Sequence, residues 1–158
     1  NASFEEFVMA LKYLENVDMD IDTKLFRDLA EYVANASGRF LPTWKPIVGA
    51  NLFVYESEIR ATTTLKDPKT FELFGPEDVG LERKIIIGKS SGINTLTHKL
   101  KELGCKIGEK EAAELAEIIR EKSLLLKRAL FDSEIIEAYN SFAGVQSAKT
   151  ASGKKGGK

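Results

Sequence analysis

The chain has only one cysteine, Cys105, among its 158 residues, so no disulfide can form within it. It has no apolar run of the roughly 20 residues that a membrane-spanning helix needs, and no signal-peptide pattern. Neither charge dominates, because 23 Lys and Arg stand against 24 Asp and Glu, which gives no electrostatic reason to expect nucleic acid or an anionic membrane as partner. We therefore expect a cytoplasmic protein that binds neither.

The length allows one or two small hydrophobic cores but not a complete (β/α)8 barrel, which needs about 250 residues. From Ser147 onward no large apolar residue occurs, and the chain ends in a lysine- and glycine-rich stretch. Such a segment cannot bury enough apolar surface to offset the entropy lost on ordering. We expect residues 144–158 to form a disordered basic tail.

Helical signals occupy the N-terminal part of the chain. Ser3 and Glu6 match a capping box, and the apolar spacing that follows predicts a helix over residues 4–15. Asp22 can cap a second helix, whose apolar stripe ends just before Gly38.

The middle and the C-terminal part predict mainly helices with little strand. We expect a helix over about 52–65, and a strand in the β-branched run at residues 84–88. An apolar helical face then ends at Gly104, a broad helical pattern follows over 112–126, and Asp132 or Ser133 can cap a last helix. The predicted fold class is mainly α with minor β, with one short strand or hairpin.

Several sequence blocks resemble, in order, motifs of the homocitrate synthase/2-isopropylmalate synthase family. Residues 45–53 resemble the family's P-I-V-G-x-x-x-F linker, and residues 1–11 resemble G-N-A-x-L-E-E-V-V-M-A-L. Further agreement with L-K-N-P-x-T-Y-E, P-E-D-V-G-L-x-R and L-G-K-H-S-G lies at residues 65–72, 75–83 and 87–92. Ordered agreement over residues 1–140 is far more specific than a single short motif.

The resemblance implies the C-terminal portion of such an enzyme. Residues 1–46 would be the terminal helices of a truncated TIM barrel, residues 47–82 a linker subdomain, and residues 83–143 a helical C-terminal subdomain. The family condenses acetyl-CoA with a 2-oxo acid in amino-acid biosynthesis, as a dimer, with a divalent metal (Mg, Mn or Zn) in the barrel. The resemblance thus implies that the chain needs a barrel domain or subunit as partner for activity, in a homo- or hetero-oligomer.

Only Asn1 aligns with a family metal ligand, the asparagine of the G-N motif, and one residue cannot hold a metal. The catalytic motif H-x-S-G-I-H reads Y-E-S-E-I-R here, so Arg60 stands where the family has a histidine. Arginine stays protonated, so it can bind a carboxylate or polarise a carbonyl but cannot act as the same base. Phe71 and Ser90 replace a tyrosine and a histidine of the other motifs.

Two interpretations of these departures remain open. In the first, a rearranged catalytic site uses Arg60, Glu56, Glu58 and Tyr55, and the chain is the lid and dimerisation part of a homocitrate synthase-like acyltransferase. In the second, catalysis is lost and an interaction module remains. Ser90, Ser91 and Gly92 could present free amides to a carboxylate or a CoA phosphate, although helix capping explains them without a ligand.

Overall fold

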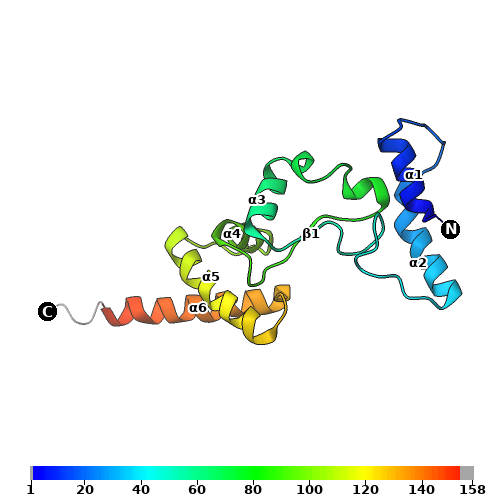
Figure 1. The fold of residues 1–158 in the computed structure, drawn as a ribbon. Helices are drawn as coiled ribbons and strands as arrows, with labels where there is room; N and C mark the ends of the chain where they lie inside the picture. The colour runs from blue at the N-terminus through cyan, green and yellow to red at the C-terminus, as the bar shows by residue number, and fades with distance from the viewer. Residues whose placement is uncertain (1, 154–158) are drawn as a thin grey trace. The chain divides into compact units, whose positions relative to one another are not determined.

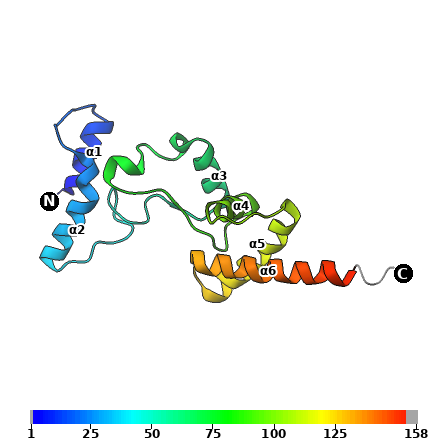
Figure 2. The same cartoon turned by 180° about the vertical axis from the view of Figure 1, so that it is seen from behind.

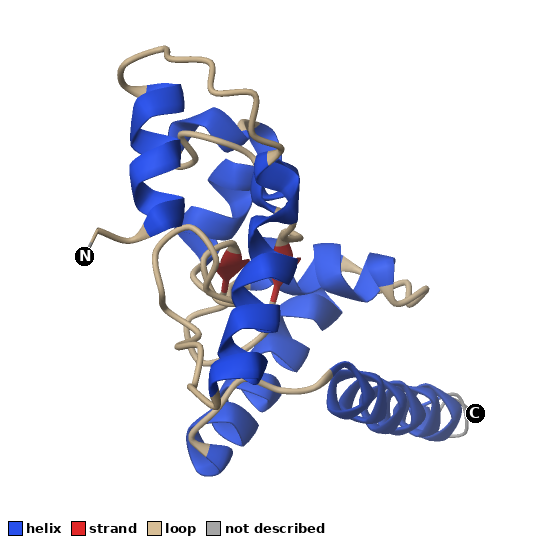
Figure 3. Cartoon of the chain, turned by 90° about the vertical axis from the view of Figure 1, so that its right-hand side faces the viewer, coloured by secondary structure: helices blue, strands red, loops and turns tan. Residues whose placement is uncertain are grey.

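The computed structural model describes residues 2–153 (Figure 1), and these residues form two compact units. The first unit contains the chain up to Tyr55 together with Thr63–Lys84, and the second contains Glu56–Thr62 and the chain from Ile85 onward. Helices dominate the described residues and strands are few (Figure 3), which confirms the predicted class of mainly α with minor β. No described helix is both long and apolar enough to span a membrane.

The first unit is built on helices α1 (Phe4–Tyr13) and α2 (Phe26–Ser37), which lie side by side in Figures 1 and 2. The Phe4 and Phe26 rings pack at a centroid distance of 5.6 Å. Three short 3-10 helices also belong to this unit: η1 (Thr23–Leu25), η2 (Pro68–Thr70) and η3 (Pro76–Val79). The buried core of the unit consists of Val8, Met9, Phe26, Ala30, Val48, Phe53 and Val79.

The helix signals of this unit were partly right. Gly38 adopts the left-handed conformation and ends α2, and the Asp22 carboxylate accepts a hydrogen bond from the Lys24 amide at 3.1 Å, as expected. The capping box was wrong, because the Ser3 hydroxyl donates to the Glu5 carboxylate at 2.9 Å instead of capping α1. A carboxylate two residues away competes successfully for the hydroxyl.

The helix expected over 52–65 is shorter than predicted. Val54–Tyr55 form strand β1, which pairs in parallel with β2 (Lys84–Ile85), and α3 begins only at Glu58 and runs to Lys66. The Lys84 amide donates to the Phe53 carbonyl at 2.9 Å, a bond across 31 positions that a local pattern does not reveal. The predicted strand over 84–88 is correspondingly short, because Ile87 bridges to Leu130 instead.

The second unit contains the first part of α3 and helices α4 (Ile93–Glu102), α5 (Glu109–Leu126) and α6 (Asp132–Gly153). Gly104, with φ 77°, follows α4 as expected. The core of this unit consists of Ile85, Ile87, Leu96, Leu100, Leu115, Ile119, Leu130 and Ile135.

The end of the second unit differs from the prediction in two respects. Neither Asp132 nor Ser133 caps α6: the Glu134 carboxylate accepts the Phe131 amide at 2.8 Å in that role. The segment 144–153, expected to be disordered, continues α6 as far as Gly153. The alanines in this segment have a high intrinsic helix propensity. Residues 154–158 of the predicted tail lie outside the described residues.

Candidate functional site

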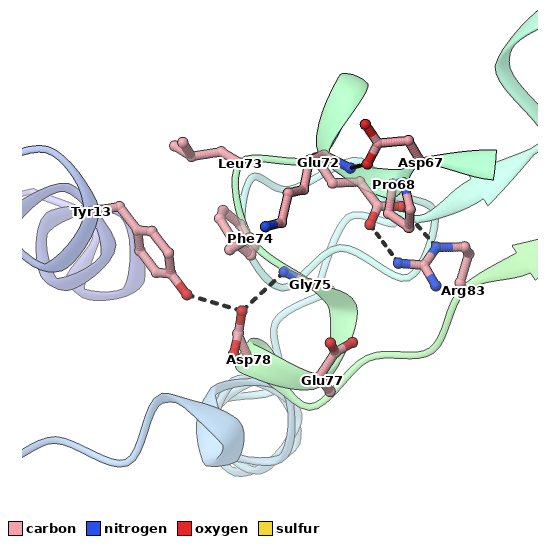
Figure 4. A pocket seen from close by; sticks show the side chains of 11 residues that line it. Tyr13, Asp67, Pro68, Glu72, Leu73, Phe74, Gly75, Glu77, Asp78 and Arg83 are labelled. Carbon is pink, nitrogen blue, oxygen red and sulfur yellow. Dashed lines mark hydrogen bonds and ion pairs between the residues drawn. The ribbon is translucent and has the colours of Figure 1, made fainter. Parts of the chain in front are cut away.

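Tyr55, a predicted catalytic residue, lies in a buried polar cluster of the first unit. Its hydroxyl donates to Glu72 Oε1 at 2.8 Å, and Arg83 Nε donates to the same oxygen at 2.9 Å. Arg83 also forms an ion pair with Glu72 Oε2, as Figure 4 shows. The Arg83 hydrogen bond, followed by that from Tyr55, holds the pKa of Glu72 below its usual value. This tyrosine ties β1 to the loop that carries Glu72.

A cavity of about 450 Å³ adjoins this cluster in the first unit (Figure 4). On its other side the Tyr13 hydroxyl donates to Asp78 Oδ2 at 2.9 Å, and the Gly75 amide donates to the same oxygen. Burial, with the Asp78 hydrogen bond, raises the pKa of Tyr13 to about 12. The phenol is therefore a hydrogen-bond donor that stays protonated at neutral pH.

The sequence alone did not indicate Tyr13, Glu72, Asp78 or Arg83 as candidate site residues. Glu72, Asp78 and Arg83 do fall inside motif blocks shared with the resembling family, which was the available signal. Tyr13 gave no signal, because its partner Asp78 lies 65 positions away.

Glu56 and Glu58 join the start of α3 to the loop before α4 in the second unit. Glu56 Oε1 accepts a hydrogen bond from the Ser90 amide at 3.0 Å. The Glu58 carboxylate accepts from three amides, those of Gly92 at 2.9 Å, Thr95 at 3.1 Å and Asn94 at 3.2 Å. The Thr95 hydroxyl also donates to it. The Glu58 carboxylate therefore caps the start of α4 from a distant segment, and Glu56 holds the loop that precedes the helix.

Burial by itself would raise the pKa of Glu58, but the hydrogen bonds from Thr95, Asn94 and Gly92 outweigh it, so the pKa lies below its usual value. A side chain at position 92 would require the carboxylate to move, because a Cβ on Gly92 would lie 2.6 Å from the Glu58 carboxyl carbon. Glu58 therefore fills the N-terminal end of α4 as a charged acceptor.

The amides expected to be free for a ligand all have acceptors within the chain. The Ser90 amide donates to Glu56 and the Gly92 amide to Glu58, while the Ser91 amide donates to the Gly88 carbonyl at 3.2 Å. The Ser91 hydroxyl donates to the Glu56 carbonyl at 3.0 Å. The chain itself thus supplies acceptors for these three amides, and binding of a ligand there stays a prediction.

Two predicted site residues remain, Arg60 and Asn1. Arg60 lies on the exposed side of α3, in the second unit, whereas the buried Tyr55 belongs to the first. Asn1, the predicted metal ligand, lies outside the described residues. The described residues contain no group of three His, Cys, Asp or Glu side chains that could hold a metal ion.

Comparison with known proteins gives the family. A family model described as "Homocitrate synthase post-HMGL domain-like" matches residues 47–124. The 2-isopropylmalate synthase 2 of Caldanaerobacter subterraneus subsp. tengcongensis is 51% identical over 139 residues, which are 88% of this chain and 36% of that protein. The homocitrate synthase 1 of Nostoc sp. is 41% identical over 136 residues, which are 86% of this chain and 36% of that protein.

A third relative, "Homocitrate synthase, omega subunit" of Clostridium pasteurianum, is 38% identical over 141 residues, which are 89% of this chain and 40% of that protein. The chain thus spans a little over a third of the length of these curated relatives. The matched part is the C-terminal region of those proteins. The chain belongs to the homocitrate synthase/2-isopropylmalate synthase family and corresponds to the C-terminal region of its members.

Proposed function

We propose that the chain is the C-terminal part of an acetyl-CoA-dependent acyltransferase that condenses the acetyl group with a 2-oxo acid, with homocitrate formation as the leading reaction. Relatives that bear the names homocitrate synthase and 2-isopropylmalate synthase support this class of reaction. We further propose that a barrel domain or subunit is needed for activity. One cysteine and the biosynthetic relatives fit a cytoplasmic location.

An apolar surface of the first unit carries the proposal of a barrel partner. On α2, Val33 is 54% exposed, and in the following loop Phe40 is 77% exposed. With Phe4, Leu29 and Leu41 they line a cavity of about 460 Å³. We call this set, Phe4, Leu29, Val33, Phe40 and Leu41, the α2 surface. Contiguous exposed apolar side chains of this kind mark a surface that another protein layer covers.

The length of the relatives and the name of one of them support a barrel partner, either on the same polypeptide or as a separate subunit. The matched relatives are more than twice as long as the chain, so most of each lies outside the matched region. One relative is named as the omega subunit of homocitrate synthase. We propose that the α2 surface packs against the barrel, within an oligomer.

The condensation requires removal of a proton from the acetyl methyl group and stabilisation of charge on the 2-oxo acid. Among the predicted residues, Arg60 is exposed on α3 and is suited to bind a carboxylate of the substrate. Tyr55 and Glu56 are held by Glu72 and by the Ser90 amide, so we propose positioning roles for them. The described residues do not fit a divalent metal by themselves, and we assign that metal to the barrel.

The test uses this chain together with the barrel region of the Caldanaerobacter relative, purified after co-expression. We expect a complex by size-exclusion chromatography with light scattering, and release of CoA from acetyl-CoA with one or more 2-oxo acids. Val33→Asp places a charge on the α2 surface and should weaken the complex at least tenfold. Leu125→Asp, at an 82% exposed position of the second unit, is the matched control and should leave it intact.

The alternative function is a non-catalytic interaction module derived from the family. This alternative is favoured because the Tyr55 hydroxyl already donates to Glu72 and the Glu56 carboxylate already accepts the Ser90 amide. A stable complex without CoA release with any 2-oxo acid would support this alternative. If the complex is active, Arg60→Ala should abolish turnover while the complex persists, and full activity of that variant would exclude Arg60 from the mechanism.

A further inference from the structure

A second cavity, of about 260 Å³, lies within the second unit. Its lining comes from the loop after β2, from the C-terminal end of α5 and from the turn that follows α5. Lys89, Lys127 and Arg128 contribute three positive charges to the lining, and Glu56 contributes the one carboxylate. The cavity is thus positively charged in a chain whose net charge is close to zero.

The three cations differ in what they already bind. Arg128 donates from both terminal nitrogens to the Glu134 carboxylate at 2.8 Å and lies 4.4 Å from the centre of the Phe131 ring. Lys89 and Lys127, in contrast, form no hydrogen bond or ion pair with any residue of the described part of the chain. Two ammonium groups without an ion pair in the described residues therefore line one small cavity together with the Glu56 carboxylate.

The turn that presents Lys127 is held in place. Lys127 follows the last residue of α5 in the left-handed conformation, with φ 55°, which costs a residue with a side chain about 1 kcal/mol. The buried Ser123 hydroxyl donates to the Arg128 carbonyl at 2.8 Å, and the ion pair of Arg128 with Glu134 fixes the other side. The lysine is therefore displayed from a defined turn rather than from a free loop.

We propose that this cavity binds a phosphate group, either as inorganic phosphate or on a phosphate monoester, between Lys89 and Lys127. Phosphate carries close to two negative charges and several acceptor oxygens, so it can accept hydrogen bonds from both ammonium groups at once. Glu56 does not cancel both charges, and its Oε1 already accepts the Ser90 amide. The exposed Leu124 gives an apolar wall for the remainder of an ester.

Glu56 lines this cavity and also has a positioning role in the proposed condensation, but the binding assay needs neither a barrel nor turnover, so its failure and that of the proposed function are distinguishable. The test is titration of the isotope-labelled 158-residue chain with inorganic phosphate at pH 7.5 and constant ionic strength, followed by amide NMR shifts. We expect saturable shifts confined to residues near 88–90 and 123–129. Lys89→Gln and Lys127→Gln should each raise the dissociation constant about tenfold.

Lys110→Gln is the matched control, since Lys110 is an exposed lysine at the other end of α5, and it should leave the dissociation constant unchanged. ADP serves as the monoester-like probe and citrate as the carboxylate probe. Saturable binding of phosphate, with or without ADP, supports the proposal and identifies the source of the group. Tighter binding of citrate than of both, shifts spread over all surface lysines, or equal losses in Lys110→Gln and Lys127→Gln would overturn it.

Discussion

Removal of the Glu58 carboxylate tests the capping of α4 from a distant segment. The carboxylate accepts three amides between 2.9 and 3.2 Å and the Thr95 hydroxyl. Loss of one N-terminal cap costs about 0.5–2 kcal/mol, and hydrogen bonds to a charged group lie at the upper end. Because Glu58 is only partly buried, we expect Glu58→Ala to lower the unfolding free energy by about 2 kcal/mol.

Thermal unfolding followed by far-UV circular dichroism measures this loss, and about 2 kcal/mol corresponds to a decrease of about 4–8 °C in Tm for a chain of this size. The folded-state pKa of Glu58 is lowered, so its contribution is fully present above the ordinary value of 4.5 and is lost as pH falls through the folded pKa. The difference between wild type and Glu58→Ala should therefore be constant near neutral pH and shrink in acid.

The control is Glu121→Ala, which removes an exposed carboxylate of α5 and should change the unfolding free energy by less than about 0.5 kcal/mol. Equal melting of Glu58→Ala and Glu121→Ala at pH 7 would refute the capping argument. A difference from wild type that grows as pH falls below 4.5 would refute the assigned direction of the pKa shift.

Two further predictions concern the first unit and the glycine turns. Arg83→Ala leaves the buried Glu72 carboxylate without its ion pair and should lower the unfolding free energy, measured with urea, by about 3 kcal/mol. The control Glu82→Ala removes an exposed neighbouring carboxylate and should lower it by less than about 0.5 kcal/mol. Equal losses in the two variants would contradict a structural ion pair. Gly104→Ala, at φ 77° in open space, should cost about 1 kcal/mol. Gly80→Ala should cost clearly more, because its Cβ would also lie 2.3 Å from the Lys24 carbonyl oxygen, and the reverse order of melting temperatures would be inconsistent with that contact.

The sequence predicts the elements whose signals are local. Gly38 and Gly104 end their helices as expected, because a left-handed residue after an amphipathic run is a signal contained within a few positions. The elements that depend on distant partners were predicted poorly. The start of α3 moved to Glu58 because Phe53 pairs with Lys84, and no local pattern contains that bond.

In the candidate site, too, local sequence signals were informative and contacts between distant residues were not predicted. The motif blocks indicated the family and drew attention to Tyr55, Glu56 and Ser90, but not to what these residues contact. The sequence predicts an apolar stripe on α2, and within the first unit Phe26 and Ala30 of this helix are buried. A stripe shows that a face is apolar, and only the structure shows which part of it the same chain covers.

Two of the departures from the family motifs, at positions 58 and 90, lie in segments that contact each other. In the motif H-x-S-G-I-H the glycine position is Glu58, and in L-G-K-H-S-G the histidine position is Ser90. These two segments meet in the second unit, where Glu56 accepts the Ser90 amide and Glu58 accepts the amides at the start of α4. A glycine at position 58 would leave those amides without this acceptor. The glutamate at this position therefore has a structural role at the start of α4. Arg60 lies exposed on the same helix, and its part in the chemistry stays a prediction that the Arg60→Ala variant tests.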